Sequence, residues 1–597
     1  MSDRLRSLRF RGWLLLPLAL AVGCRGPGNA QPTQLDQGMV VCEHPLAAEV
    51  GVRVLERGGN AADAAVATAF ALAVCYPQAG NLGGGGLALW VPARGNPRAL
   101  DFREQAPHGA YSGVYYDAHG RAVPEALREG AFSVAVPGSP AGLYALYRGQ
   151  GSGRLSFEEL VRPAVKLARR GFAVDAHLAY TLSRPAIRAR LEASPGAREL
   201  FYPGGEPLAQ GELLVQPELA DTLERLGRRG PNGFYTGRVA EAIVAELQAS
   251  QAQPEAPAFE GPWISGADLE GYSVAWREPL RGWFRGQEVI AMPPPSSGGI
   301  VLLQVLAVLD GFPLDSERAR GLARGADIAQ DVTPEGLGPR TVHWWIEALR
   351  AAFAERARHL GDPDFTAVPV EDLLSAEWVA RCRMSIGEET HLEDVPPPQP
   401  EGANTTHLSV VDRAGNAVSL TTTLNSSFGS ALLVRGAGFL LNNEMDDFSL
   451  GGEAANQFGL RGGEANSIRP GKRPLSSMTP TVLREGGHRV SLVLGSPGGP
   501  RIITAVIAVI LRRLVFQQTL EDAVAAPRFH QQWSPPETYV EPGWPKPLLE
   551  ELERRGHRIV AEDERWASVQ AIEVRRGGEV TGVSDPRRGG VAVGTKR

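Results

Sequence analysis

The chain has 597 residues, of which 43% are hydrophobic and 21% are charged, proportions typical of a globular protein with ample apolar side chains for a core. Its formal net charge is −6 and no long basic run occurs, which argues against nucleic acid as a partner. The 70 glycines and 46 prolines predict many turns and tight loops.

The first 24 residues have the pattern of a secretory signal peptide. Four arginines within the first 11 residues precede an apolar run over residues 13–22, which is too short to span a bilayer comfortably. The run ends in Gly23 and Cys24, and a small residue followed by cysteine is similar to a bacterial lipobox. We therefore expect an exported protein, either in the bacterial periplasm or anchored to a membrane as a lipoprotein through Cys24. Ordinary cleavage nearby is the alternative, and residues 25–37 are expected to form a flexible linker.

The other cysteines, Cys42, Cys75 and Cys382, are not spaced as metal ligands. Neither a Cys-x-x-Cys nor a His-Glu-x-x-His motif occurs and the histidines are not clustered in the sequence, so we predict neither a metal nor a cofactor. Cys42 and Cys75 would be able to pair in an oxidising compartment, but the sequence cannot fix this, and we favour buried, inert thiols.

The folded part is predicted to begin at residue 38 with two helices, over residues 45–57 and 61–74. A run of four glycines, residues 83–86, then precedes a strand over residues 87–91. The run lacks the Gly-Lys-Ser/Thr ending of a phosphate-binding loop and leads into a strand, so we interpret it as a place where two backbones pack tightly. Further helices are expected over residues 130–148, 156–171, 218–228, 237–248, 300–309, 344–361 and 502–514, and further strands over residues 280–292 and 490–494.

The most informative segment begins at the polar, proline-rich run over residues 396–404, which predicts an exposed linker. Directly after it, residues 407–411 and 417–424 are predicted to be strands joined by a turn. Cleavage between Asn404 and Thr405 would make Thr405 a chain terminus. Its hydroxyl would then lie beside its own α-amine, whose ordinary pKa is near neutrality, so one residue would supply both nucleophile and base. Ordinary strand propensity is the alternative explanation for threonine here.

Long motifs follow in a fixed order: TTHLSVVD, GFLLNNEMDDFS, RPLSSMTP and GSPGGPRI. Together with FREQAP and PQAGNLGGGG nearer the start, they resemble the γ-glutamyltranspeptidase (glutathione hydrolase) family of N-terminal-nucleophile hydrolases over nearly all of residues 38–597. The resemblance implies a four-layer αββα sandwich and a proenzyme that cuts itself between Asn404 and Thr405. A large subunit, residues 38–404, and a small catalytic subunit, residues 405–597, would form the fold jointly. Residues 315–341 are longer than we expect for the family and predict a surface insertion.

The resemblance also implies roles for individual residues. Thr405 would be the nucleophile, Thr423 would hydrogen-bond it, and Gly498 and Gly499 would donate two N–H groups to an oxyanion. The α-carboxylate of a glutamyl substrate would be held by Arg103, Ser476 and Ser477. Its α-amine would be held by Asn425, Glu444 and Asp447.

Some positions have alternative explanations. An ordinary ion pair with Glu104 is the alternative role for Arg103, and cross-strand pairing is the alternative for Thr421. Asp446 is expected to be structural. Phe458 lies in a glycine-rich loop, residues 450–468, that matches a lid on which the family often has a tyrosine.

These roles predict that Thr405 attacks the γ-glutamyl amide of glutathione or a related compound and forms a γ-glutamyl-enzyme. Water or an amino-acid or dipeptide acceptor would release it, with no cofactor or metal. One alternative is a cephalosporin (glutaryl) acylase, whose substrate lacks the α-amine. Arg103, Glu444, Asp447 and the Ser476–Ser477 pair together favour a zwitterionic glutamyl head and argue against it. A non-catalytic surface lipoprotein is the second alternative. The absence of a Gly-x-Ser-x-Gly motif disfavours a serine hydrolase of the α/β type, while acceptor preference and oligomeric state stay open.

Overall fold

Side chains that alternate along the strands are buried on both faces of two stacked, antiparallel sheets. The computed structural model describes residues 33–36, 38–117, 119–253, 257, 259–314, 333, 336–390, 392, 403–451 and 455–596. The first sheet contains, in spatial order, β1 (Thr33–Leu35), β18 (Val580–Ser584), β17 (Gln570–Val574), β13 (Arg489–Gly495), β12 (Thr481–Glu485), β9 (Gln287–Ala291) and β8 (Leu280–Phe284). The second contains β19 (Val591–Gly594), β2 (Met39–Cys42), β10 (Ala403–Val411), β11 (Ala417–Ser426), β3 (Gly85–Val91), β4 (Arg98–Phe102) and β7 (Ala275–Arg277).

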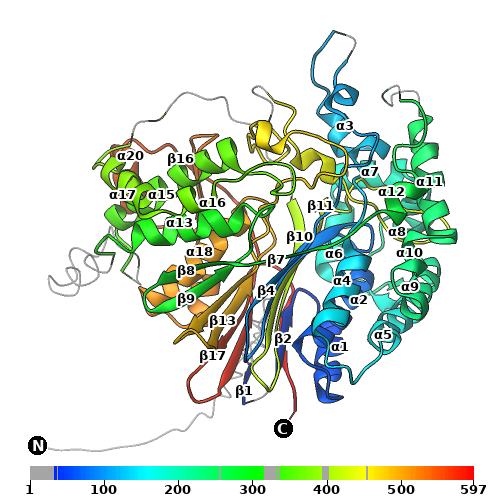
Figure 1. Cartoon of the computed structure of the whole chain (residues 1–597), viewed down its shortest axis with the longest axis horizontal. Helices are drawn as coiled ribbons and strands as arrows, with labels where there is room; N and C mark the ends of the chain where they lie inside the picture. Colours follow the sequence, from blue (N-terminus) through cyan, green and yellow to red (C-terminus); the bar gives the residue numbers. More distant parts are fainter. Residues whose placement is uncertain are drawn as a thin grey trace, which may run out of the picture. The chain divides into compact units, whose positions relative to one another are not determined.

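Helices cover the outer face of each sheet (Figure 1). Those on the first sheet's side are α13 (Gly298–Leu309), α15 (Pro339–His359), α16 (Val370–Leu373), α17 (Ala376–Ser385), α18 (Arg501–Leu514), α19 (Leu520–Ala525) and α20 (Lys546–Arg554). The other layer is built on α1 (Pro45–Glu56), α2 (Ala61–Cys75), α4 (Ser139–Gln150), α5 (Phe157–Arg170), α9 (Pro217–Arg229), α10 (Asn232–Tyr235), α11 (Arg238–Gln251) and α12 (Gly266–Glu270). The shorter elements are α3 (Glu125–Arg128), α6 (Ala176–Ser183), α7 (Pro185–Ala193), α8 (Pro195–Phe201) and two small sheets, β5 (Phe172–Ala173) with β6 (Leu213–Leu214) and β14 (Phe529–His530) with β15 (Thr538–Val540) and β16 (Ile559–Ala561).

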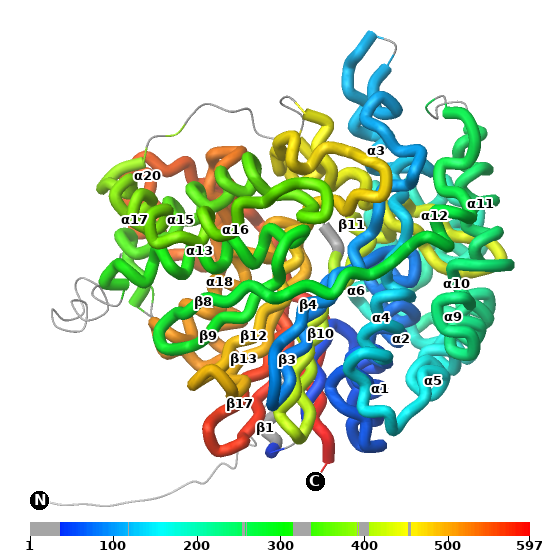
Figure 2. The backbone as a smooth tube through the Cα atoms, in the orientation of Figure 1, coloured from blue at the N-terminus to red at the C-terminus, as the bar shows by residue number. Residues whose placement is uncertain are grey.

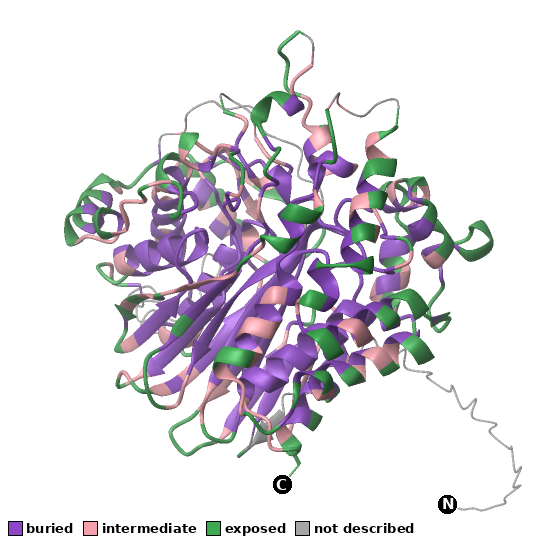
Figure 3. Ribbon diagram, turned by 45° about the vertical axis from the view of Figure 1, so that its right-hand side comes forward, coloured by how far each residue is buried: buried purple, intermediate pink, exposed green. Residues whose placement is uncertain are grey.

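The alternation in β3 shows how one strand serves two cores. Leu87 and Leu89 belong to the cluster that fills the space between the sheets, while Ala88 and Trp90 belong to the cluster under α1 and α2. This follows because successive side chains of a strand point to opposite faces. Buried residues accordingly fill the strands, and exposed residues are concentrated on helix surfaces and loops (Figure 3). The four-layer αββα sandwich predicted from the sequence is confirmed.

Strands from the two halves of the chain lie next to one another in both sheets. β10 and β11 lie between β2 and β3, so that Leu408 pairs with Cys42 and Leu420 pairs with Ala88. Figure 2 shows β3 and β4 in blue beside β10 and β11 in yellow-green. In the first sheet, β9 pairs with β12. Residues 38–404 and 405–597 therefore build the fold jointly, as expected.

The glycine run packs tightly against other backbones, as predicted. A Cβ atom on Gly84 would lie 2.0 Å from the carbonyl oxygen of Thr423, and one on Gly86 would lie 2.5 Å from that of Thr421. At Gly83 the nearest atom would be the carbonyl oxygen of Leu440, at 2.1 Å. A side chain at any of these positions would push β11 or residues 440–441 away from β3.

Several boundaries differ from prediction: the helix expected over residues 344–361 begins at Pro339, and the strand expected over residues 280–292 is divided into β8 and β9. The helix expected from residue 130 begins only at Ser139, because Val136 precedes a proline, which disfavours helix, and pairs instead with Gln105. β1 lies inside the predicted linker 25–37 and pairs with β18. β10 begins at Ala403, before the expected start of the hairpin.

Some predictions concern residues outside the described part of the chain. Cys24, the signal peptide and most of residues 315–341 lie outside the described residues, although Pro339 already starts α15. Cys42, Cys75 and Cys382 are buried, unpaired thiols. None of the described helices combines the length and the apolar character that crossing a membrane requires.

Candidate active site

Thr405 lies in β10 with its side chain buried at the end of the hairpin. Its register partner in β11 is Thr423, and the two Oγ1 atoms are 3.2 Å apart. The Thr423 hydroxyl also accepts a hydrogen bond of 2.9 Å from the backbone N–H of Asn425. The two hydroxyls are thereby fixed relative to one another by neighbouring strands of a buried sheet.

The pairing of β10 and β11 is irregular at the predicted cleavage point. Ala403 pairs with Ser426 and Thr405 with Thr423, so two β11 residues, Leu424 and Asn425, face the single backbone position of Asn404. Asn425 has a φ of 75°, in the left-handed region that non-glycine residues seldom adopt. Bulges of this kind re-aim side chains and are frequent beside active sites.

A pocket opens beside the Thr405 hydroxyl. Nine of the ten residues that the sequence singled out for catalysis or substrate binding line it, and Gly498 lines the adjoining pocket. The nine are Arg103, Thr405, Thr423, Asn425, Glu444, Asp447, Ser476, Ser477 and Gly499. Phe458, Met478 and Ile502 complete the wall. No role was predicted for the last two, although each lies within one of the motifs quoted above.

Arg103 is fully buried and lies among three carboxylates. Its guanidinium pairs with Glu444 and Asp447, and its Nη1 lies 3.3 Å from Glu104. The intraprotein pair with Glu104 therefore exists, but the residues predicted to hold an α-amine also contact Arg103 directly. Burial alone would lower the pKa of Arg103, yet the three carboxylates together raise its pKa above the ordinary value. Burial raises the pKa of Glu104 to about 7 in spite of Arg103.

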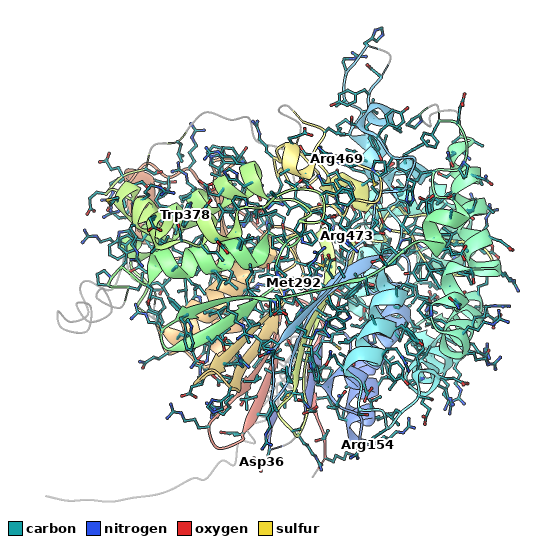
Figure 4. All side chains as sticks on the ribbon, in the orientation of Figure 1. Asp36, Arg154, Met292, Trp378, Arg469 and Arg473 are labelled. Atoms are coloured by element: carbon teal, nitrogen blue, oxygen red, sulfur yellow. The ribbon has the colours of Figure 1, made fainter. Side chains whose placement is uncertain are left out.

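A second layer of charges fixes the backbone at Arg103. Asp101, at the end of β4, accepts a hydrogen bond of 3.0 Å from the Arg103 N–H. The other Asp101 oxygen pairs with Arg277 at 2.9 Å and with Arg473 at 3.5 Å. Figure 4 labels Arg473, which lies near the upper end of the strands in that view. The position of the Arg103 side chain is thus set by a buried network as well as by its own carboxylate partners.

Two polar atoms on residues that line the pocket lack a hydrogen-bond partner among the described residues: Oε2 of Glu444 and the hydroxyl of Ser477. Burial raises the pKa of Glu444 well above its ordinary range, and Arg103 opposes this shift. Because unsatisfied buried polar atoms are costly, such atoms in a pocket wall indicate a place where a ligand completes the hydrogen bonding. A ligand with both a cationic and an anionic group would match this set.

The glycine turn between β13 and α18 faces the nucleophile. Gly498 and Gly499 have φ angles of 128° and 57°, which favour glycine. Neither backbone N–H has an acceptor among the described residues. The turn lies at the N-terminus of α18, a helix of 14 residues, where the helix dipole stabilises negative charge. The turn therefore has the chemistry of an oxyanion hole.

The loop that carries Phe458 is tied to the acidic turn. Asn456 donates to Asp447 at 3.0 Å, and the N–H of Gln457 donates to Asp446 at 3.0 Å. Asp446 also pairs with Arg128 at 3.3 Å and does not line the pocket, an arrangement that fits the structural role expected for it. Burial raises the pKa of Asp446 to about 7.

Other residues that support the site were missed in the sequence. Arg588 donates to the carbonyl oxygen of Thr405 at 3.4 Å, and Asn81 donates to that of Thr423 at 2.9 Å. The carbonyl oxygen of Asn443 accepts from the Asn425 side chain at 2.9 Å. Both come from segments far from Thr405 in sequence. Asn81 lies within the motif PQAGNLGGGG, which was a signal, whereas Arg588 lies in none of the motifs quoted above.

The sequence predicted no metal site. The described residues nevertheless contain one group of potential ligands, His343, Glu347 and His557. None of the three lines the pocket beside Thr405. The two imidazoles already satisfy one another: His343 Nδ1 lies 2.7 Å from His557 Nε2, and His343 Nε2 lies 3.0 Å from the carbonyl oxygen of Gly387. Arg350 pairs with Glu347 at 2.9 Å. Hydrogen bonding and an ion pair thus account for the cluster.

Known proteins are similar to this chain over most of its length. The family model described as Gamma-glutamyltranspeptidase matches residues 47–595. A glutathione hydrolase proenzyme of Pseudomonas sp. (strain A14) is 40% identical over 535 residues, which are 88% of this chain and 87% of that protein. Among solved structures, a cephalosporin acylase from Bacillus halodurans has a TM-score of 0.79 at 26% identity and covers 96% of this chain and 98% of its own. The gamma-glutamyltranspeptidase of Helicobacter pylori has a TM-score of 0.51 at 38% identity, covering 58% of this chain and 90% of its own.

Proposed function

Because the chain belongs to the γ-glutamyltranspeptidase family, we propose that it is a self-processing enzyme that hydrolyses glutathione and related γ-glutamyl amides and transfers their γ-glutamyl group. The observation that carries this proposal is the single pocket in which the Thr405 hydroxyl, the buried Arg103–Glu444–Asp447 charges and Gly499 meet. Among the described residues, this pocket brings a nucleophile together with groups for both ends of an amino acid.

Maturation starts with Thr405 Oγ1, which attacks the carbonyl carbon of Asn404. The peptide C–N bond breaks as an ester C–O bond forms, and water then hydrolyses the ester. The products are a carboxylate on Asn404 and a free α-amine on Thr405. The irregular β10–β11 pairing at Asn404 supports this step, since it removes the scissile bond from the regular ladder.

In the mature enzyme the Thr405 α-amine accepts the hydroxyl proton while Oγ1 attacks the γ-carbonyl of the substrate. The oxyanion that develops accepts hydrogen bonds from the N–H groups of Gly498 and Gly499. The leaving amine departs with the proton, which leaves a γ-glutamyl ester on Thr405. Thr423 orients the nucleophile through the hydroxyl contact of 3.2 Å.

When the glutamyl head binds, its charged groups replace the contacts that Arg103 makes with Glu444 and Asp447 in the site. Its α-carboxylate would take the guanidinium of Arg103 and the hydroxyls of Ser476 and Ser477, and its α-amine would take Glu444 and Asp447. Arg103 already pairs with Glu444 and Asp447 in the site, so a zwitterion can replace these contacts by giving the guanidinium an anionic partner and the carboxylates a cationic one. Water, an amino acid or a short peptide then releases the acyl group.

A cephalosporin acylase is the second candidate, and the TM-score of 0.79 with such an enzyme favours it. A glutaryl substrate has no α-amine. It would leave Glu444 and Asp447 without a cation once its carboxylate engaged Arg103, and burying an unpaired carboxylate is costly. Hydrolysis of glutaryl and γ-glutamyl anilides side by side separates the two candidates.

The proposals of export and of membrane anchoring are based only on the signal-peptide pattern of residues 1–24. The arginine-rich start, the apolar run over residues 13–22 and the small residue before Cys24 support a lipoprotein anchored through Cys24 or a periplasmic enzyme. Metabolic labelling with a palmitate analogue, compared with a Cys24→Ala variant, tests the anchor.

The decisive experiment compares purified wild type with Thr405→Ala by intact-mass analysis and a γ-glutamyl anilide assay. We expect two fragments from wild type, the smaller beginning at Thr405, and one inactive, uncut chain from the variant. A wild-type chain that remains whole and inactive under native conditions would overturn the proposal and favour a binding protein.

A further inference from the structure

A charged pair lies beside the main chain of the nucleophile. Arg588, which follows β18, donates a hydrogen bond of 3.4 Å to the carbonyl oxygen of Thr405. Its guanidinium lies 3.8 Å from the carboxylate of Glu43, whose side chain is fully buried. β2 ends at Cys42, opposite Leu408, so Arg588 contacts the edge of β10 beyond the point at which β2 still pairs with it.

The strand geometry also fixes the direction of the Thr405 nitrogen. Thr405 and Thr423 are directly paired, and their carbonyl oxygens point away from one another, because Arg588 reaches the first and Asn81 reaches the second. In an antiparallel ladder the N–H and the C=O of one residue point to the same side of the strand. The nitrogen of Thr405, which becomes the α-amine on cleavage, therefore faces the side on which Arg588 lies.

Glu43 is an unusual partner for an arginine. Neither of its carboxylate oxygens has a hydrogen-bond partner among the described residues. Burial raises the pKa of Glu43 to about 7, although Arg588 and the nearby hydroxyls of Thr406 and Ser568 lower it. A buried carboxylate without hydrogen bonds is costly, so stabilisation of the fold does not account for this pair.

The groups around the pair are neutral or already compensated. The titratable and charged groups that face it are Cys42, Tyr76 at the end of α2, His177 on α6 and Asp585, and those on the pocket side of Thr405 are Arg103, Glu104, Glu444 and Asp447. Asp585 pairs with two other arginines, at 2.6 and 3.0 Å. Burial raises the pKa values of the thiol and the phenol and lowers that of the imidazole to about 4, so these three groups are neutral near pH 7.

We propose that Arg588 and Glu43 are positioning residues for the nucleophile: Arg588 holds the main chain of Thr405 and keeps its α-amine unprotonated near neutral pH, and Glu43 opposes this effect. The inference rests on the proposed function, in which the amine must be unprotonated to accept the hydroxyl proton. A cation on the side of the amine disfavours the ammonium form, whereas an ionised carboxylate favours it. The pair thereby sets the pH at which Thr405 becomes an active nucleophile.

The test follows the pH dependence of kcat/KM for hydrolysis of a γ-glutamyl anilide without acceptor, because its acid limb reports the base of the free enzyme. Glu43→Gln leaves the charge of Arg588 uncompensated and should move the acid limb to lower pH by about one unit. Arg588→Gln removes the cation and should move the limb to higher pH by a similar amount. Arg588→Lys keeps the positive charge and should return the limb toward its wild-type position.

Glu288→Gln is the matched control. Glu288 pairs with Arg484 at 2.8 Å, both side chains are 6% exposed, and neither residue lines the pocket beside Thr405. This variant breaks a comparably buried pair and should leave the acid limb in place. The carboxylates around Arg103 are the same in every variant, so they do not contribute to the differences. Intact-mass analysis gives the cleaved fraction of each preparation, and rates are expressed per cleaved chain.

Opposite displacements by the two halves of one ion pair are the decisive result, since a merely structural role lowers activity without moving the acid limb in two directions. Either Glu43→Gln or Arg588→Gln decides by itself if the other does not fold or mature. An acid limb that stays at the wild-type position, or moves in the direction opposite to that expected, would overturn the inference. A wild type that does not hydrolyse the anilide at all would instead overturn the proposed function, and this inference with it.

Discussion

The hydroxyl oxygens of Thr405 and Thr423 lie 3.2 Å apart across the β10–β11 pair, and the N–H of Asn425 holds the second hydroxyl from its other side. The relationship is a product of strand register, because each hydroxyl belongs to one of two directly paired residues. A nucleophile placed in this way has little freedom to rotate out of line.

Replacing Thr423 by alanine should slow catalysis without weakening substrate binding. The change removes one hydrogen bond to Thr405, worth about 0.5–1.5 kcal/mol, so we expect kcat to fall roughly 2–10-fold and KM to stay near its wild-type value. Thr423→Ser keeps the hydroxyl and is the matched control. Steady-state kinetics on a γ-glutamyl anilide measures the difference, and equal kcat values for the two variants would contradict the positioning role.

Arg103→Gln should destabilise the protein as well as abolish binding of the glutamyl head. It leaves the buried carboxylates of Glu104 and Glu444 and the partly buried carboxylate of Asp447 without their common cation, and breaking a buried pair costs about 3–5 kcal/mol. Arg103→Lys keeps the charge but cannot reach both partners with a planar fork, so an intermediate loss is expected. Urea unfolding of all three proteins measures the order, and equal stability of wild type and Arg103→Gln would refute the account.

Gly498→Ala should inactivate the enzyme by moving the oxyanion turn. At a φ of 128° an added Cβ would be strained, and it would lie only 3.2 Å from the Cβ of Ala567. Loss of one oxyanion donor lowers kcat by about 10²–10³-fold. Gly577→Ala, where an added Cβ has open space, is the control and should be near wild type in activity. A fully active Gly498→Ala protein would remove this turn from the mechanism.

His407 should contribute to acid sensitivity. It is buried between the sheets, 2.8 Å from the Thr421 hydroxyl, and burial lowers its pKa from 6.5 to about 3. The folded-state pKa of His407 is below its unfolded value, so the folded protein binds fewer protons at this residue. The contribution of neutral His407 to the free energy of unfolding is therefore fully present above about pH 6.5 and is lost as the pH falls toward 3.

The corresponding measurement compares wild type with His407→Gln, which keeps a polar side chain but does not titrate. Thermal midpoints between pH 7 and pH 4 should fall less steeply for the variant. His530, whose pKa is also lowered to about 3 by burial, leaves a residual slope in both proteins. Identical slopes would show that His407 does not contribute to the acid sensitivity.

Local patterns were enough to predict much of this protein. The hairpin around residues 412–416, the buried helix α2 and the close packing of the glycine run follow from strand alternation, helical spacing and turn chemistry. These signals depend on neighbours within a few residues, so they can be recognised from the sequence alone. The boundary at Ser139 was missed although Pro137 is a local signal against helix at Val136. The bridge between Gln105 and Val136, which also opposes the helix, joins residues that are distant in sequence.

The sequence by itself determined the family, the layer architecture and the set of polar residues that meet beside Thr405. Only the tertiary structure decided how those residues are paired. Arg103 and Glu444 are 341 positions apart, and their ion pair depends on the order of strands in the sheet and on the turn that carries the acids. The periodicity of apolar side chains indicates which face of a helix or strand is buried. Contacts between elements that are distant in sequence arise only when the sheets and helices have packed.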